Sequence, residues 1–182
     1  MDENRKSVRY QELFNWMHSI VVAAIVLLGV LTFIGGPIGV HGHSMMPTLD
    51  AEDRMLVRSI FYTPDRGDVV VLSRRSFEDG TALVKRVIAL EGDVVNIDTT
   101  SGLVYVNDRP LHEPYVSDLT RRLGSLSFPF AVPAGHVFVL GDNRNHSMDS
   151  RDIEIGAVDE REIIGQVVAV FLPLNRARLL VS

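Results

Sequence analysis

"ALVKRVIAL", residues 82–90, decides the fold because it has the pattern of a buried strand with one lysine among aliphatic residues. Successive side chains of a strand point to opposite faces, so alternate residues form two separate sets. The two sets are Leu83, Lys85 and Val87 on one face, and Val84, Arg86 and Ile88 on the other. Lys85 is therefore predicted to have aliphatic neighbours, while the charge of Arg86 points elsewhere.

Runs of this type continue through the chain after residue 50, separated by Gly, Asp, Asn and Pro. The predicted strands are residues 54–60, 68–73, 82–90, 93–98, 102–107, 136–141 and 165–172. Residues 106–111, VNDRPL, predict a hairpin exit, and residues 112–135, with three prolines, predict a loop or an edge. The expected fold is compact and mostly β, either barrel-like or folded from antiparallel sheets.

A stretch near the N-terminus is predicted to cross a membrane. Residues 13–40 contain no Asp, Glu, Lys or Arg, and residues 20–34 are almost purely aliphatic. The hydrocarbon core of a bilayer is spanned by about 20 predominantly apolar residues. The chain of 182 residues has room for one domain beside such an anchor. We expect an N-terminal segment at 1–12, a single transmembrane helix at 13–38 and a β domain at 39–182.

The basic residues beside this stretch indicate its orientation. Arg5, Lys6 and Arg9 precede it, whereas Arg54 is the first cation after it. Lys and Arg favour the cytoplasmic side, so we expect a cytoplasmic N-terminus and an extracytoplasmic β domain at the plasma membrane. The alternative is a cleaved secretory signal, which has a shorter apolar region of about 7–15 residues and an A-x-A-like site. Here GGPIGVHGH follows instead, which favours a retained anchor.

Charge and composition exclude several function classes. Residues 41–182 hold 15 basic and 20 acidic residues, which provides no basic face for nucleic acid. The absence of cysteine excludes disulfides and thiolate metal sites. His41 and His43 have no further ligand cluster beside them, and residues 142–149 lack the spacing of a calcium loop. We expect neither a metal nor a cofactor.

Ser44 and Lys85 suggest nucleophilic catalysis. Lys85 is one of only two lysines among 18 basic residues, and a buried lysine, unlike arginine, can lose its proton and act as a base. A serine hydroxyl is a weak nucleophile that needs such a base. Gly42 permits a tight approach to Ser44, and Pro47 prevents a regular helix there. The alternative for Lys85 is an exposed lysine whose stem covers apolar neighbours.

Four ordered blocks then make the sequence recognisable. They are SMMPTL (44–49), RGDVVVL (66–72), LVKRVIALEGD (83–93) and GDNRNHSMDSR (141–151). Together with the preceding apolar stretch they resemble the bacterial type I signal peptidases, membrane-bound Ser/Lys proteases that remove signal peptides from exported proteins. The resemblance covers essentially the whole chain. It implies signal peptides and the phospholipid membrane as partners, and the export machinery indirectly.

The resemblance also implies roles for individual residues. By position in the blocks, Ser44 matches the nucleophile, Lys85 the general base and Ser147 the serine that orients the lysine amine. Asp149 and Arg151 match positions that hold the site together by charge pairing. Asp142 and Arg86 are expected to form a similar pair.

The resemblance leaves the oxyanion hole to backbone groups. The Ser44 N–H is the implied donor, and Gly42 stands where some members of the family have a serine whose hydroxyl helps. The neighbouring apolar residues are expected to line a shallow substrate groove for small side chains, with packing into the core as the alternative for the methionines. The expected groove residues are Met45, Met46, Leu49, Leu83 and Val84.

Other functions compete with this hypothesis. A LexA-like self-cleaving protease shares the Ser/Lys chemistry, but it has a DNA-binding segment where this chain has an apolar stretch. A specialised peptidase for conjugation, pilin-like or organelle inner-membrane substrates stays open. From another class, the chain is an inactive membrane-anchored β module that binds exported partners. The distance between the Ser44 hydroxyl and the Lys85 amine discriminates the enzyme from the module.

Overall fold

The structure is a computed structural model that describes residues 11–25, 38–39, 42–73 and 82–180. Residues 11–25 are helical. Residues 26–37 of the predicted anchor lie outside the described residues. Among the helices of the described ranges, none has the length and apolar character needed to cross a membrane. Ile38, the last residue of the predicted anchor, belongs to the first strand.

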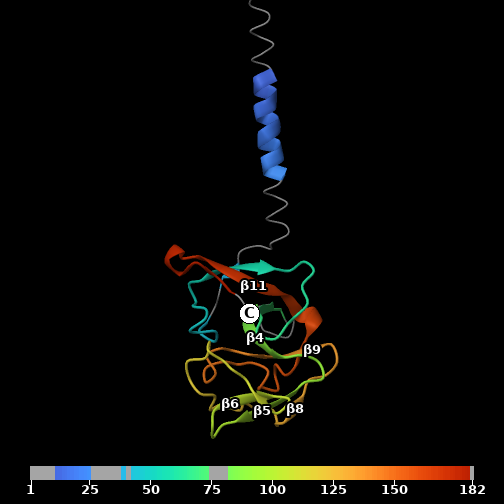
Figure 1. The fold of residues 1–182 in the computed structure, drawn as a ribbon, viewed down its shortest axis with the longest axis vertical. Helices are drawn as coiled ribbons and strands as arrows, with labels where there is room; N and C mark the ends of the chain where they lie inside the picture. Colours follow the sequence, from blue (N-terminus) through green and yellow to red (C-terminus); the bar gives the residue numbers. More distant parts are fainter. Residues whose placement is uncertain (1–10, 26–37, 40–41, 74–81, 181–182) are drawn as a thin grey trace, which may run out of the picture.

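The body consists of two antiparallel sheets (Figure 1). The eight-stranded sheet has the order β1-β2-β11-β3-β4-β9-β10, with β12 paired to β11, and the four-stranded sheet has the order β7-β6-β5-β8. The larger sheet contains β1 (Ile38–Gly39), β2 (Arg54–Arg58), β3 (Val69–Leu72), β4 (Leu83–Ala89), β9 (His136–Leu140), β10 (Val158–Asp159), β11 (Ile163–Leu172) and β12 (Arg178–Leu179). The smaller sheet contains β5 (Val94–Asp98), β6 (Leu103–Val106), β7 (Arg109–Pro110) and β8 (Phe130–Ala131). The helical turns in the described part of the body are the 3-10 turns η2 (Glu160–Glu162) and η3 (Leu174–Arg176).

The seven predicted strands are confirmed, and so is the predicted hairpin. Val106 pairs with Arg109 across a turn in which Asn107 and Asp108 have φ angles of 52° and 62°. Two consecutive residues with positive φ match the right-handed twist of the strands that they join, and Asn and Asp tolerate that conformation well. Residues 112–135 form a loop that contains only β8, a strand at the edge of the smaller sheet.

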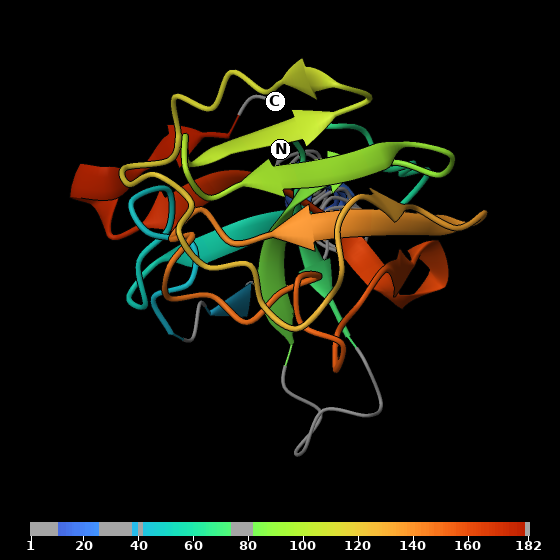
Figure 2. The same ribbon diagram turned by 90° about the horizontal axis from the view of Figure 1, so that it is seen from below.

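The core divides into three clusters of buried side chains. One lies among β2, β3 and β11, and it includes Met45 and Leu49. The second joins β4 and β9 to β5 and β6, and the third lies along β3, β4 and β9. Figure 2 shows β5 and β6 side by side, seen from below. The second cluster therefore fastens the smaller sheet to β4 and β9.

Strand β4 lies between β3 and β9, and its alternation agrees with the prediction. Val84 belongs to the first core cluster, whereas Val87 belongs to the third. Lys85 is opposite Val70 in β3, and Arg86 is opposite Leu140 in β9. Because Leu140 is the last residue of β9, the segment GDNRNHSMDSR (residues 141–151), called the GDNR block or GDNR loop below, begins directly beside Arg86. The topology thus brings residues 141–151 next to the lysine strand.

Candidate active site

A turn at residues 43–49 carries Ser44. The Met46 N–H donates to the His43 carbonyl at 3.3 Å, and the Leu49 N–H donates to the Met45 carbonyl at 2.9 Å. Gly42 precedes the turn with a φ of +85°, a conformation that other residues rarely adopt. A Cβ at Gly42 would meet no atom within 4 Å. The backbone conformation, and not the close approach expected from the sequence, therefore explains this glycine.

The structure brings Ser44 and Lys85 together across 41 residues of sequence. The Lys85 Nζ lies 2.8 Å from the Ser44 Oγ and 2.9 Å from the Val84 carbonyl oxygen. Only 2% of Lys85 is exposed, while Ser44 is half-buried. The exposed-lysine alternative is therefore wrong. A buried amine in contact with a partly accessible hydroxyl is the geometry that a lysine base and a serine nucleophile require.

Burial changes the acid–base chemistry of Lys85. Loss of water around the amine lowers its pKa from 10.5 to about 8, because the charged form is destabilised in the protein interior. The negative charges of Asp149 and Asp142 act in the opposite direction. A substantial fraction of the amine is therefore neutral near pH 8, and only the neutral form can accept a proton.

Asn143 and Gly141 hold the serine turn against the GDNR loop. The Asn143 N–H donates to the Ser44 carbonyl at 3.0 Å, and its side-chain amide donates to the His43 carbonyl at 3.2 Å. A Cβ at Gly141 would lie 2.5 Å from the Ser44 carbonyl oxygen and 2.2 Å from the Ser147 Oγ. Only glycine leaves room for both groups here. Sequence reasoning assigned no role to either residue, although both lie within the GDNR block that it singled out.

Ser147 is buried next to this junction. Its Oγ donates to the Met148 carbonyl at 3.5 Å, which is long for a hydrogen bond. Within the described residues, no hydrogen bond joins Ser147 to Lys85. Because the Ser147 Oγ and the Ser44 carbonyl both contact the position of a Gly141 Cβ, Ser147 lies close to the pair.

Arg86 and Asp142 form a buried ion pair on the other face of β4. Arg86 donates from Nε and Nη2 to the two carboxylate oxygens of Asp142, at 2.8 and 2.7 Å. The Thr48 hydroxyl donates to the same carboxylate at 2.5 Å. Thr48 belongs to the serine turn, so this ion pair connects the lysine strand, the GDNR loop and the turn. The pairing of Arg86 with Asp142 agrees with the expectation from the family resemblance, whereas the part of Thr48 was not expected.

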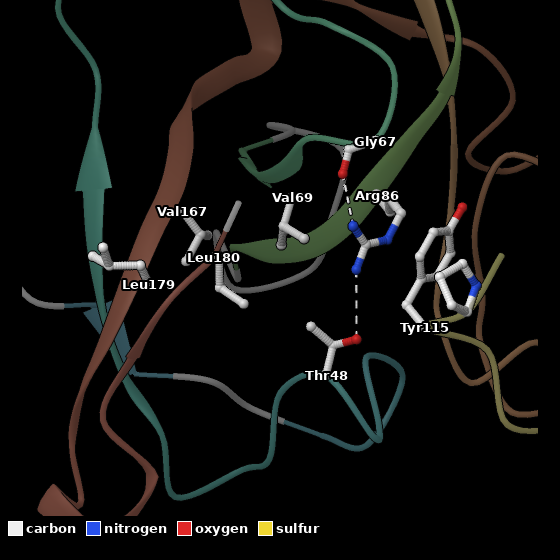
Figure 3. A pocket seen from close by; sticks show the side chains of 9 residues that line it. Thr48, Gly67, Val69, Arg86, Tyr115, Val167, Leu179 and Leu180 are labelled. Carbon is white, nitrogen blue, oxygen red and sulfur yellow. Dashed lines mark hydrogen bonds between the residues drawn. The ribbon is translucent and has the colours of Figure 1, made fainter. Parts of the chain in front are cut away.

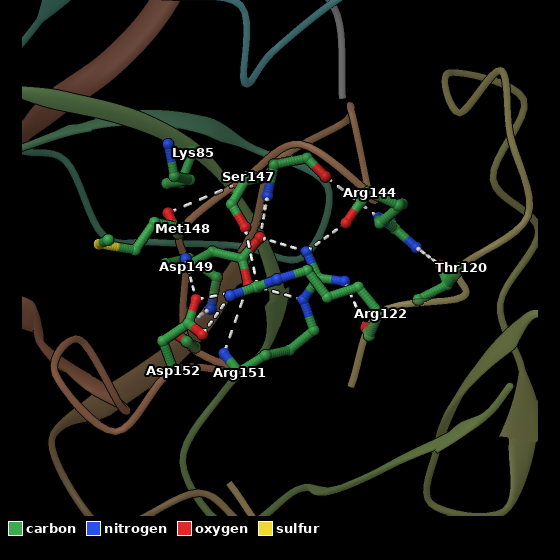
Figure 4. A network of polar contacts seen from close by, with 12 residues as sticks. Lys85, Thr120, Arg122, Arg144, Ser147, Met148, Asp149, Arg151 and Asp152 are labelled. Carbon is green, nitrogen blue, oxygen red and sulfur yellow. Dashed lines mark hydrogen bonds and ion pairs between the residues drawn. The ribbon is translucent and has the colours of Figure 1, made fainter. Parts of the chain in front are cut away.

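Asp149 and Arg151 form a second, fully buried pair (Figure 4). Arg151 donates from Nε and Nη2 to Asp149 at 2.7 and 2.8 Å, and its remaining donors reach the carbonyls of Arg144 and Arg122. Asp149 also accepts the Gly141 N–H at 3.0 Å. A buried ion pair stabilises only when its other donors and acceptors are also satisfied. This pair meets that condition and fixes the ends of the GDNR block relative to each other.

The expected oxyanion donor is not engaged within the described residues. The Ser44 N–H makes no hydrogen bond to any of them. Gly42 has no side chain to add a second donor. The geometry is therefore compatible with a backbone donor at Ser44.

Burial corrects the expected substrate groove. Met45 and Leu49 are 1% and 0% exposed and pack in the first core cluster, so neither side chain lines an open surface. Val84 is also buried in that cluster, and Leu83 is half-buried. Met46, at 38% exposed, is the methionine of the turn that faces solvent. The turn places alternate apolar residues inward, a distinction that the linear sequence does not reveal.

A serine hydroxyl beside a buried lysine amine, on a body of antiparallel sheets, is the arrangement that the class of Ser/Lys hydrolases uses. The chain belongs to the signal peptidase family, peptidase S26, whose family model matches residues 13–172. The resemblance seen in the sequence is thereby confirmed.

Known relatives match over nearly the full length of the chain. It is 33% identical to a signal peptidase I of Bacillus licheniformis, over 98% of both chains. It is 36% identical to a signal peptidase I P of Bacillus subtilis subsp. natto, over 97% of this chain and 96% of the relative. A solved structure of a signal peptidase I from Enterococcus faecalis V583 is 29% identical, with a TM-score of 0.46, and covers 58% of this chain and 97% of that one.

Proposed function

We propose that this chain is a membrane-anchored signal peptidase, a serine endopeptidase that removes N-terminal signal peptides from exported proteins. Family membership and similarity to proteins named signal peptidase I support the reaction class. The 2.8 Å contact between the Lys85 amine and the Ser44 hydroxyl carries the catalytic proposal. We also propose that cleavage follows small residues, at sites of the Ala-x-Ala type.

The proposed reaction uses Lys85 as the base in both halves. The neutral Lys85 Nζ accepts the hydroxyl proton while the Ser44 Oγ attacks the carbonyl carbon of the scissile bond. The Ser44 N–H donates to the oxyanion that forms. The C–N bond then breaks, and Lys85 gives its proton to the leaving amine. Water attacks the acyl ester, Lys85 takes the proton of that water, and the proton passes to the Ser44 Oγ as the product acid leaves.

The surrounding residues have supporting roles in this proposal. Ser147 orients the lysine amine through its hydroxyl. The ion pairs of Asp149 with Arg151 and of Asp142 with Arg86 hold the GDNR block and the serine turn in place. Both carboxylates also keep the pKa of Lys85 from falling further, which leaves the amine able to deliver a proton to the leaving group.

Cleavage of a synthetic peptide tests the assignment of the two residues. The full chain in detergent is expected to cut a peptide with an Ala-x-Ala site after the second alanine. Ser44→Ala and Lys85→Arg are expected to lower kcat by at least about 1,000-fold, because they remove the nucleophile and the base. Lys6→Arg is the matched control, since it replaces the other lysine of the chain and is expected to keep wild-type activity.

The other outcomes separate the competing functions. Cleavage by the Ser44→Ala or Lys85→Arg variant would overturn the Ser/Lys assignment. No cleavage by the wild type of this peptide or of a set of full-length preproteins would favour the inactive binding module. Cleavage of conjugation or pilin-like precursors alone would favour the specialised peptidase.

We propose further that residues 13–38 anchor the protein in the plasma membrane, with residues 1–12 in the cytoplasm and residues 39–182 outside. The charge-free stretch and its preceding basic residues support this arrangement. The serine turn follows the proposed anchor by only a few residues, which places Ser44 near the membrane surface. A signal peptide also presents its cleavage site just beyond an apolar segment.

Extraction and protease protection of the full chain in cells test the anchor. The protein is expected to stay with membranes in alkaline carbonate. Protease added to spheroplasts is expected to digest residues 39–182 and to spare a tag at the N-terminus. Release by carbonate would exclude an anchor, and digestion of the tag would reverse the orientation.

A further inference from the structure

The loop between β7 and β8 makes buried polar contacts with the site although it has no regular secondary structure. We call residues 113–122 of this loop the brace. Three of its side chains make the principal contacts: the carboxylate of Glu113, the ring of Tyr115 and the guanidinium of Arg122. The Thr120 hydroxyl also accepts from Arg144 at 3.3 Å. These groups reach the residues beside Lys85 and inside the GDNR block. A loop that only joined two strands of the smaller sheet would not need them.

At the first contact, Glu113 neutralises the buried guanidinium of Arg144. The two carboxylate oxygens of Glu113 accept from Nη1 and Nη2 of Arg144 at 2.8 and 2.5 Å. Arg144 is only 1% exposed, and its Nε donates to the Gly141 carbonyl at 3.1 Å. Gly141 is the residue against which the Ser44 carbonyl and the Ser147 hydroxyl pack. Glu113 therefore acts on the junction of the site through Arg144.

At the second contact, Tyr115 covers the Arg86–Asp142 pair. The centroid of its ring lies 3.8 Å from the Cζ of Arg86 (Figure 3). The Tyr115 hydroxyl donates to Glu113 at 3.0 Å. Arg86 is the neighbour of Lys85 in β4, and Asp142 accepts the hydroxyl of Thr48 from the serine turn. An aromatic ring over a guanidinium excludes water and adds an attractive cation–π interaction. Tyr115 thus shields the ion pair that joins the two halves of the proposed dyad.

At the third contact, Arg122 holds the other side of the GDNR block (Figure 4). It donates to the Ser147 carbonyl at 3.1 Å and to both carboxylate oxygens of Asp152, at 3.0 and 2.5 Å. Its own carbonyl accepts from Arg151 at 2.8 Å. The brace is therefore attached to the block at Arg144, at Ser147 and at Arg151.

We infer that the brace positions the Ser44–Lys85 pair for reaction, and that Glu113 and Tyr115 are positioning residues of this peptidase. The inference rests on the proposed function. Neither residue touches the reacting atoms; each acts through a group adjacent to them, Glu113 through Arg144 and Gly141, and Tyr115 through Arg86. Because the serine turn and β4 are fixed to each other by Asp142, a displaced Arg86 or Gly141 changes the distance between nucleophile and base. Misplacement by about 1 Å can lower a catalytic rate by up to roughly 100-fold.

Steady-state kinetics of the full chain in detergent test the brace. Glu113→Gln keeps the shape of the side chain but turns an amide toward the guanidinium donors, and Tyr115→Leu removes the aromatic face. Each is expected to lower kcat by about tenfold or more with KM changed less than about twofold. Tyr115→Phe keeps the ring over Arg86 and is expected to lose less than Tyr115→Leu. The matched control is Asp118→Asn, an exposed carboxylate of the same loop that accepts a hydrogen bond from its neighbour Ser117 and takes part in none of the three contacts above.

Melting temperatures measured beside the kinetics separate positioning from mere stability. The proposal would be overturned if the variants melted at lower temperatures but kept the wild-type kcat at assay temperatures well below melting. Equal losses of kcat in Asp118→Asn and Glu113→Gln would also overturn it. If Glu113→Gln does not fold, the contrast between Tyr115→Leu and Tyr115→Phe decides. If the wild type is active, Ser44→Ala is inactive and the brace variants are unaffected, only the positioning role of the brace is refuted. An inactive wild type would instead refute the proposed function.

Discussion

At the scale of single residues, the site depends on a lysine that is deprived of water. Lys85 has aliphatic neighbours on its own strand and lies opposite Val70 of β3. It has two hydrogen-bond partners among the described residues, the Ser44 hydroxyl and the Val84 carbonyl. An ammonium group is poorly stabilised by two neutral acceptors in the interior. The same environment therefore disfavours the charged form of Lys85 and allows its neutral amine to act as a base at moderate pH.

The first consequence is a pH dependence that differs from that of an ordinary lysine. Since burial lowers the pKa of Lys85 to about 8, kcat/KM is expected to rise with pH below 8 and to level off above it. At pH 7 about a tenth of the amine is neutral, by the same relation. The measurement is kcat/KM for a peptide without ionisable groups between pH 6 and 10. An inflection near 10.5, or no dependence on pH, would contradict the assignment of Lys85 as base.

At the scale of elements, the longer strands were predictable, whereas the two-residue strands β1, β10 and β12 and the junctions between strands were not. The runs that contain Val69–Leu72, Leu83–Ala89 and His136–Leu140 are apolar enough to be read as strands from the sequence alone. The partnership of Arg86 with Asp142 was implied by the resemblance to the family, and the pairing of β4 with β9 accounts for it. Local patterns decide the longer strands, because alternation and burial act over a few residues.

The turn and the loops follow from contacts between distant residues. Whether Met45 or Met46 faces the core depends on how the serine turn lies against β2 and β11, which no local pattern specifies. The contact between Glu113 and Arg144 joins residues 31 apart, and that between Thr48 and Asp142 joins residues 94 apart. In the sequence, polar residues such as these indicate a solvent-exposed loop. Their polar contacts are evident only in the folded structure, where their partners Arg144 and Arg86 are buried.

Gly141 illustrates how little freedom these junctions have. It follows β9 directly, and its missing side chain leaves room for the Ser44 carbonyl from one element and the Ser147 hydroxyl from another. Its N–H and carbonyl are bound by Asp149 and Arg144. A glycine in the sequence suggests a turn, but here close packing between three segments is the reason. The site is thus assembled where elements meet, not within one of them.

At the scale of the whole molecule, the dyad should reduce the stability of the fold. The pKa of Lys85 is about 8 in the folded protein and 10.5 when exposed, so the unfolded chain binds more protons between these values. Stability therefore rises with pH across this window, and below pH 8 the buried amine costs the full difference. At about 1.4 kcal/mol for each step of one in pKa, the difference between 8 and 10.5 corresponds to about 3.5 kcal/mol.

Replacement of Lys85 by methionine is expected to show this cost directly. Lys85→Met fills a similar volume without a charge, so at pH 7 its free energy of unfolding should exceed that of the wild type by about 1–3 kcal/mol, while peptidase activity is lost. The gain should shrink as pH rises from 8 to 10.5, because the wild-type amine then becomes neutral as well. Denaturant unfolding of both full chains in the same detergent at pH 7 and pH 10.5 measures the two differences. A variant less stable than the wild type at pH 7 would mean that the bonds of the amine to Ser44 and Val84 outweigh its desolvation, and that the fold gains stability from its base.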